Sequence, residues 1–128
     1  MEQSTIKKYE LVNEDTIVLG DVTLFRVKAL ISFGAVKKGD LGGYVENEGN
    51  LSHSGYAKVY DNAEVTGNAK VYGNARVFGD ACVAGDAWVI DNARIYGKAK
   101  VTGNARVFGT ARVSGDATVA GDAIVYGR

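Results

Sequence analysis

The chain has 128 residues, of which 46% are hydrophobic, and its 15 basic and 15 acidic side chains give a formal net charge of zero. This composition predicts one soluble domain, because no apolar run approaches the roughly 20 residues needed to cross a membrane, and the balanced charge gives no global attraction to nucleic acid or anionic lipid. A single cysteine, Cys82, excludes an internal disulfide and, with no signal peptide visible, favours a cytoplasmic location.

Residues 1–40 follow no repeat and predict an N-terminal β-hairpin. The segments 15–19 and 22–30 have the composition of strands, and Gly20-Asp21 between them suits a two-residue hairpin turn. The end of a stack of repeats exposes unpaired backbone donors and acceptors, so terminal units usually differ from the repeat itself. We therefore expect residues 1–40 to cap residues 41–128, the two parts forming one structural domain.

From Ala57 to Ala123 an alanine recurs at every sixth residue, and Val or Ile follows two residues after each one. Alternate side chains of a strand point to opposite faces, so each alanine and its partner point inward and the residue between them points outward. Gly-Asn, Gly-Asp and Asp-Asn pairs supply the corners, because Gly, Asn and Asp accept a positive φ. The six-residue period indicates a parallel β-helix. In the same phase the lattice extends back to Leu41, and this unbroken register predicts no loop or lid.

Several segments carry a resemblance to a known family. They are Lys8-Tyr9-Glu10-Leu11, Leu24–Leu30, Val36–Val45, Asn50-Leu51-Ser52-His53 and the Asn-Ala-x-Val repeats. With these segments the chain resembles the hexapeptide-repeat superfamily, and within it a group of bacterial and phage proteins related to YdcK. The resemblance implies an all-β fold, a left-handed parallel β-helix of triangular section, with about 18 residues per coil and a little under five coils in residues 41–128.

Three corners per coil assign the outward residues to three sides, on each of which residues i and i+18 stack. One side carries a basic row beside an aromatic row, and its candidate ligand-binding residues are Lys58, Arg76, Arg94, Arg112, Tyr60, Phe78 and Tyr96. A second, flatter side includes Cys82. The third side is the most apolar, and we expect it to form a subunit interface through Tyr72, Trp88, Ile90, Phe108, Ile124 and Tyr126. An exposed apolar strip of this length predicts a homo-oligomer, either a dimer or a trimer.

The basic side has two interpretations. Positive side chains with aromatic neighbours are the usual combination for single-stranded nucleic acid, so one hypothesis is a phage-type protein that sequesters a nucleotide or a single strand. Against it, corner aspartates are available to balance the arginines, namely Asp80, Asp86, Asp116 and Asp122. A charged row that repeats with the lattice is more often a solvated or ion-paired face, which argues against nucleic acid as the partner.

Catalysis would depend on one residue, His53. The resemblance implies an acyltransferase alternative, because many members of the superfamily use coenzyme A and a catalytic histidine, and His53 is the only histidine. Counted along the lattice it shares the position of Val71, so we expect it to point inward as a hydrogen-bonded core residue, with Asn47 as a candidate partner. A general base must instead reach its substrate. One histidine and one cysteine also make no zinc site, so we expect no metal.

These observations favour a non-catalytic structural or binding protein. It is expected to be rigid, to need no cofactor, and to self-associate through its aromatic sides or through an open C-terminal end. The alternative is a minimal acyltransferase of the acetyl coenzyme A type, whose site forms at a subunit boundary around His53.

Overall fold

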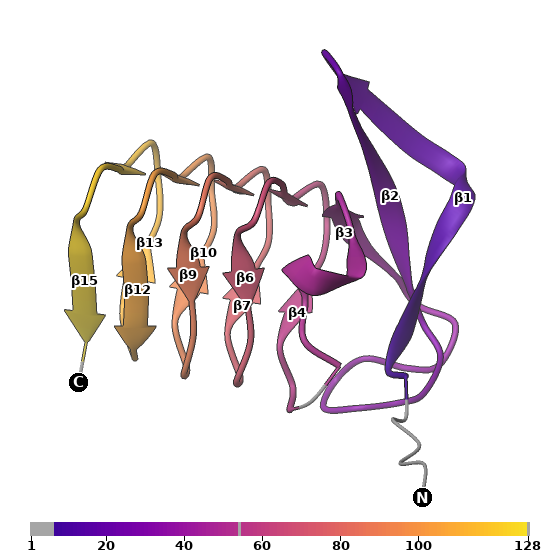
Figure 1. Cartoon of the computed structure of the whole chain (residues 1–128). Coiled ribbons are helices and arrows are strands. Elements are labelled where there is room, and N and C mark those ends of the chain that lie inside the picture. Colours follow the sequence, from indigo (N-terminus) through magenta and orange to yellow (C-terminus); the bar gives the residue numbers. More distant parts are fainter. Residues whose placement is uncertain (1–6, 54, 128) are drawn as a thin grey trace, which may run out of the picture.

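The computed structural model describes residues 7–53 and 55–127, which form a three-sided parallel β-solenoid with a β-hairpin at one end (Figure 1). The first side, the hairpin sheet, consists of β1 (Tyr9–Leu19), β2 (Val22–Ala29), β3 (Leu41–Val45), β5 (Glu64–Val65), β8 (Cys82–Val83), β11 (Lys100–Val101) and β14 (Thr118–Val119). The second, the basic sheet, consists of β4 (Lys58–Val59), β7 (Arg76–Val77), β10 (Arg94–Ile95) and β13 (Arg112–Val113). The third, the apolar sheet, consists of β6 (Lys70–Val71), β9 (Trp88–Val89), β12 (Arg106–Gly109) and β15 (Ile124–Gly127). The predicted all-β solenoid is confirmed.

The hairpin forms as predicted and extends the hairpin sheet beyond the first coil. Strands β1 and β2 are antiparallel and turn at Gly20-Asp21, where Gly20 has a φ of 61°. Strand β1 begins at Tyr9, earlier than the expected Asp15. Its pairing with β2 is irregular between Val12 and Thr16 but continues on the N-terminal side of that break, where Tyr9 pairs with Ala29. Strand β2 pairs antiparallel with β3, which pairs in parallel with β5. The hairpin therefore shares a sheet with the coils.

Inside the coils, alanine with valine or isoleucine forms one continuous core. From Ala57 to Val107 these inward residues are at most 2% exposed. Each packs in register on its equivalent one coil away, as Val59 does on Val77. Full burial of one such valine contributes about 1.5 to 3 kcal/mol to the free energy of folding. The predicted inward orientation of the alanines and of their partners is confirmed.

The predicted register breaks once, in the first coil. Leu51 lies opposite Val71, which is 20 residues later in the chain. Val59 lies opposite Val77, which is only 18 residues later. Two extra residues therefore stand between Leu51 and Val59, and the unbroken lattice expected from Leu41 onward is wrong at this corner. Arg128, where that lattice was expected to end, and residues 1–6 of the expected cap lie outside the described residues.

The 3-10 helix η1 (Glu48–Asn50) explains why the first coil departs from the lattice. The lattice assigned inward positions to Asn47 and His53, and both side chains are polar. Instead Asn47 caps η1 by accepting a hydrogen bond from Gly49 N–H. The buried Asn50 side chain donates to two carbonyls of the next coil, at 2.8 and 3.1 Å. Leu51 then takes the inward position and is 2% exposed.

The corners of the coils depend on positive φ angles. Most of these positions hold glycine, but Asp61 and Asp91 also have a φ of 60°. Their carboxylates accept hydrogen bonds from glycine N–H groups one coil later, at 3.2 and 3.0 Å. Glycine is required elsewhere because successive corners touch. A Cβ on Gly85 would lie 2.9 Å from the backbone N and O of Gly103.

Gly85→Ala is expected to cost more stability than Gly121→Ala, although both residues belong to the same row of corners. Gly121 has a φ of 64° and nothing within 4 Å of an added Cβ, so its substitution should lower the free energy of unfolding by about 1 kcal/mol, the cost of the φ angle. Gly85→Ala adds a clash with backbone and should cost about 3 kcal/mol. Chemical denaturation measures both values, and equal losses would contradict the close packing of the corners.

Candidate functional site

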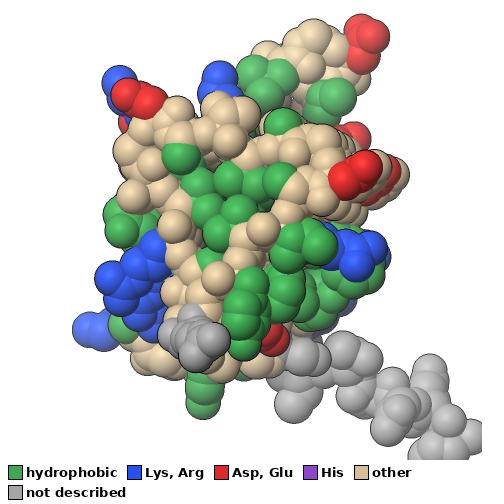
Figure 2. Space-filling view, turned by 90° about the vertical axis from the view of Figure 1, so that its left-hand side faces the viewer, with side chains coloured by type: hydrophobic (Ala, Val, Ile, Leu, Met, Phe, Trp, Pro, Cys, Tyr) green, Lys and Arg blue, Asp and Glu red, His purple; other side chains and the backbone are tan. Residues whose placement is uncertain are grey.

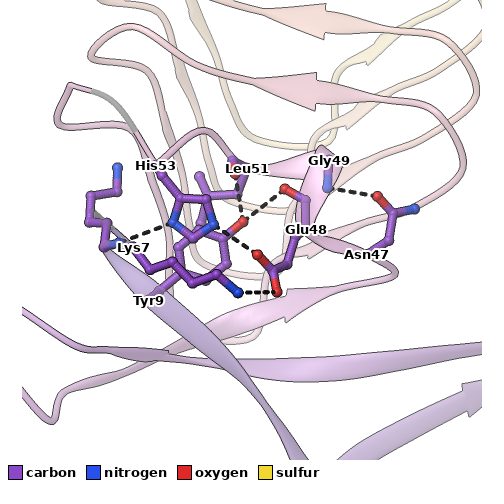
Figure 3. Close-up of polar contacts among 8 residues, drawn as sticks. Lys7, Tyr9, Asn47, Glu48, Gly49, Leu51 and His53 are labelled. Carbon is purple, nitrogen blue, oxygen red and sulfur yellow. Dashed lines mark hydrogen bonds and ion pairs between the residues drawn. The ribbon is translucent and has the colours of Figure 1, made fainter. Parts of the chain in front are cut away.

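His53 lies at the N-terminal end of the solenoid, clamped between the hairpin and η1 (Figure 3). Its ring stacks on Tyr9 with the centroids 4.1 Å apart. The Nδ1 atom accepts a hydrogen bond from Lys8 N–H at 3.0 Å, and Nε2 lies 3.0 Å from Glu48 Oε1. Because a backbone N–H only donates, Nδ1 is unprotonated, and the neutral ring carries its proton on Nε2, where it donates to Glu48.

The side chains of Lys8 and Tyr9 supply the hydrogen-bond donors that the backbone of a preceding coil would supply at later positions of the solenoid. In later coils, the carbonyls of the corner glycine and the following alanine accept hydrogen bonds from the preceding coil. In the first coil Lys8 Nζ donates to Ala57 O at 2.7 Å and to Gly55 O at 3.4 Å. The Tyr9 hydroxyl lies 2.6 Å from Leu51 O. Both residues are 1% exposed, and burial lowers the pKa of Lys8 from 10.5 to about 8.

This arrangement makes His53 a structural clamp. The ring is hydrogen-bonded as expected, but the expected pairing with Asn47 is wrong, because its partners are Lys8 N–H and Glu48. The expected inward orientation is also wrong, because Leu51 takes the inward position. The hydrogen bond from His53, followed by the charge of Lys7 at 3.4 Å, lowers the pKa of Glu48. The His53 side chain is 17% exposed, and both nitrogens are occupied. A general base needs a nitrogen that can reach the proton of a substrate, and this geometry offers none.

Lys8→Met is expected to remove a pH dependence of stability. Between pH 8 and 10.5 the unfolded chain binds more protons at Lys8 than the folded chain does, so the free energy of unfolding rises with pH in this window. Denaturation at pH 7.5 and 9.5 should show a gain of about 1 to 2 kcal/mol in the parent. The gain should vanish in Lys8→Met and persist in Lys7→Met, whose side chain is 58% exposed. Equal slopes in all three proteins would contradict the burial of the Lys8 charge.

The aromatic row of the basic side stacks on itself. Tyr60 and Phe78 are 4.9 Å apart with an angle of 9° between their rings, and Phe78 and Tyr96 are 5.0 Å apart at 5°. Both faces of Phe78 are therefore covered by its neighbours. The face of Tyr60 is also approached by Lys58 Nζ, 4.7 Å from the ring centroid. Tyr60 and Phe78 therefore do not offer the free faces on which bases could stack, as the nucleic-acid hypothesis requires, whereas Tyr96 is stacked on one face by Phe78.

Among the described residues, the corner acids form no ion pair with the basic row. Asp80, Asp86 and Asp122 each accept a hydrogen bond from an asparagine one coil earlier, at 3.5, 3.2 and 3.2 Å. Among the described residues, no ion pair involves Lys58, Arg76, Arg94 or Arg112. The corner aspartates therefore do not pair directly with this row in the described part of the chain. Burial, followed by the positive charge of Arg76, lowers the pKa of Lys58.

A groove of about 410 Å³ runs along the basic row. The four cations line it, and so does a second row one corner earlier that consists of Asn74, Asn92 and Thr110. The segment 33–35 and Tyr56 line the groove where it meets the hairpin. Sequence reasoning named the cations but missed Asn74 and Asn92. The signal was present, because this is the row of corners in which the second residue is never an acid.

The apolar side is partly covered by its own contacts. Trp88 receives the guanidinium of Arg106 over its ring at 4.9 Å and the edge of Tyr72 at 6.2 Å. Phe108 and Tyr126 are 4.8 Å apart. Within this expected interface, Tyr72, Trp88, Ile90 and Phe108 are half-buried. Two members, both in the last coil, are largely exposed, Ile124 at 65% and Tyr126 at 61%.

Cys82 and the acidic side chains suggest no further reactive centre. Burial, followed by the nearby Glu64 carboxylate, raises the pKa of the Cys82 thiol, and its Sγ lies 3.8 Å from Glu64 Oε1. A raised pKa keeps the thiol protonated and unreactive. Over residues 7–53 and 55–127, no three His, Cys, Asp or Glu side chains gather in a way that could hold a metal ion. In the same ranges no helix is long and apolar enough to span a membrane.

Comparison with known families finds one match. Residues 69–85 and 111–127 each match the YdcK β-solenoid repeat. Both segments lie within the stacked coils, and the match agrees with the three-sheet solenoid. No curated protein matches the chain. The chain is thus similar to this repeat in its coils, and the similarity concerns the fold.

Proposed function

We propose that the protein is a non-catalytic scaffold that dimerises through the C-terminal end of its solenoid. The observation that carries the proposal is the state of the last coil. Within the described part of the chain, β13, β14 and β15 each have a neighbouring strand on one side only. Unpaired strand edges present rows of backbone donors and acceptors and are templates for pairing with another chain.

The end face is also apolar. The inward residues Val119 and Val125 are half-buried, whereas the valines one coil earlier are 0% exposed. Figure 2, which views the molecule from this end, shows hydrophobic side chains gathered at the centre of the face. Ile124 and Tyr126 of the same coil add exposed apolar surface at its edge. Covering such a face removes apolar area from water, which favours association.

The two ends of the solenoid differ, and this difference favours a closed dimer. At the N-terminal end, Lys8 donates to the carbonyls of Gly55 and Ala57 and Tyr9 to that of Leu51, so part of that edge is already occupied by side chains. This occupied edge makes head-to-tail stacking into a filament less favourable than contact between two C-terminal ends. Two C-terminal ends that meet about a two-fold axis use the same patch in both copies, and each covers the open edge of the other.

The other functions considered receive less support. The sides of the apolar sheet are half-buried by their own stacking, so we place the interface at the last coil instead of along the whole side. The acyltransferase alternative required a histidine that reaches substrate, and both nitrogens of His53 are occupied. The proposal also includes left-handed winding and membership of the hexapeptide superfamily, which the six-residue period supports. It includes a cytoplasmic location, which the single cysteine supports.

The double variant Ile124→Glu/Tyr126→Glu is expected to abolish the dimer. Four added charges in a two-fold contact repel one another and require burial, while the fold should persist because both side chains point outward. Light scattering coupled to size exclusion should give twice 13.5 kDa for the parent and 13.5 kDa for the variant.

Lys70→Glu/Tyr72→Glu is the matched control. These residues occupy the same two lattice positions three coils earlier in the apolar sheet. Association through the end face predicts that this control remains a dimer. Dissociation of both variants would instead place the interface along the side, and a parent that is monomeric at high concentration would refute the proposal.

A further inference from the structure

The cations of the basic sheet form a straight row parallel to the solenoid axis. Arg94 lies opposite Arg76 and Arg112 in the parallel register, and Lys58 lies opposite Arg76. The coil spacing is about 4.8 Å, so three steps extend over about 14 Å. A parallel sheet holds these positive charges beside one another, and none has an ion-pair partner among the residues described.

Uncommitted amide donors flank this row. In the other two corner rows, asparagine side chains are occupied, since Asn62, Asn68 and Asn104 donate to aspartates one coil later. In the row that lines the groove, Asn74 and Asn92 have no such acid. Their side chains are exposed and make no hydrogen bond within residues 7–53 and 55–127. The groove thus combines fixed cations with available amide donors.

The surroundings of the groove favour an anionic ligand that carries no nucleobases. Among the described residues, no carboxylate lines it. Asp91, the one acid in the adjoining corner row, accepts a hydrogen bond from Gly109 N–H at 3.0 Å. The neighbouring aromatic row presents stacked rings, and Phe78 has both faces covered. Bases would therefore gain little from this side, whereas successive anionic groups would meet one cation per coil.

We propose that this groove binds a linear chain of phosphate groups. The ligand would lie along the axis, with its oxygens accepting hydrogen bonds from the guanidinium groups of Arg76, Arg94 and Arg112, from Lys58, and from the amides of Asn74 and Asn92. Arginine suits this role because its planar fork of donors matches a phosphate group. Phosphate oxygens would also relieve the repulsion between neighbouring cations. Segment 33–35 and Tyr56 limit the groove toward the hairpin.

Binding of inorganic tripolyphosphate, measured by titration calorimetry, tests the proposal. The parent should bind it saturably and less tightly as salt is added. The triple variant Arg76→Gln/Arg94→Gln/Arg112→Gln should lose on the order of 100-fold in affinity or more, because each charge-assisted hydrogen bond contributes roughly tenfold. Circular dichroism and thermal unfolding confirm that the variant retains the fold. No binding to the parent at millimolar ligand would overturn the proposal.

Lys70→Gln/Lys100→Gln/Arg106→Gln is the matched control, because it removes three cations from the other two sheets and changes the net charge equally. It should bind tripolyphosphate within about threefold of the parent. Equal losses in both triple variants would show that only net charge matters and would refute a built site.

An oligothymidylate of the same charge should bind more weakly than the inorganic chain, and tighter binding would assign the groove to nucleic acid instead. The solution mass should not change in either triple variant, which separates this test from that of the end face.

Discussion

The stacking of each residue on the residue 18 positions later is the constraint on which the whole solenoid depends. Each position must suit a near copy of itself about 4.8 Å away. Glycine fits at corners such as Gly85 because a Cβ would meet the backbone of the next coil. Aromatic rings suit the constraint because they stack face to face with an offset. Alanine and valine suit it because the core then repeats without gaps.

A stacked fold must also end, and each end has to deal with backbone groups that lack a neighbour. At the N-terminal end the chain solves this with side chains, since Lys8 and Tyr9 supply the donors that a preceding coil would supply. His53 and Glu48 then hold that segment in place. Burying the Lys8 amine is costly, and its lowered pKa reports that cost. Polar residues concentrated at this end therefore stabilise a boundary of the fold and need no catalytic role to explain them.

The sequence predicted the structural features that the six-residue period sets, and the prediction was wrong where two extra residues interrupt that period. The inward alanines and the hairpin turn at Gly20-Asp21 follow from local spacing and turn chemistry, whereas the three sides were expected from the family resemblance. The two-residue insertion before Val59 did not, because Leu51 and His53 both lie on plausible phases and only the contact of Leu51 with Val71 decides between them. The occupation of His53 Nδ1 depends on Lys8, 45 residues away in the chain, and no local pattern encodes a contact over that separation.

Charged side chains differ from the other groups of the lattice, because identical charges stacked one coil apart repel one another. Asparagine above aspartate resolves the conflict in the corner row of Asn68 and Asn104 by alternating a donor with an acceptor, and the pair Asn62 and Asp80 does so in a second row. The basic row instead repeats Arg76, Arg94 and Arg112, whose charges repel one another, and the amides of Asn74 and Asn92 beside it donate to no aspartate among the described residues. Local preference and the repeat therefore disagree along this groove, while they agree in the core and at the other corners. Such disagreements concentrate at functional sites in natural proteins, because binding compensates for what folding leaves unsatisfied.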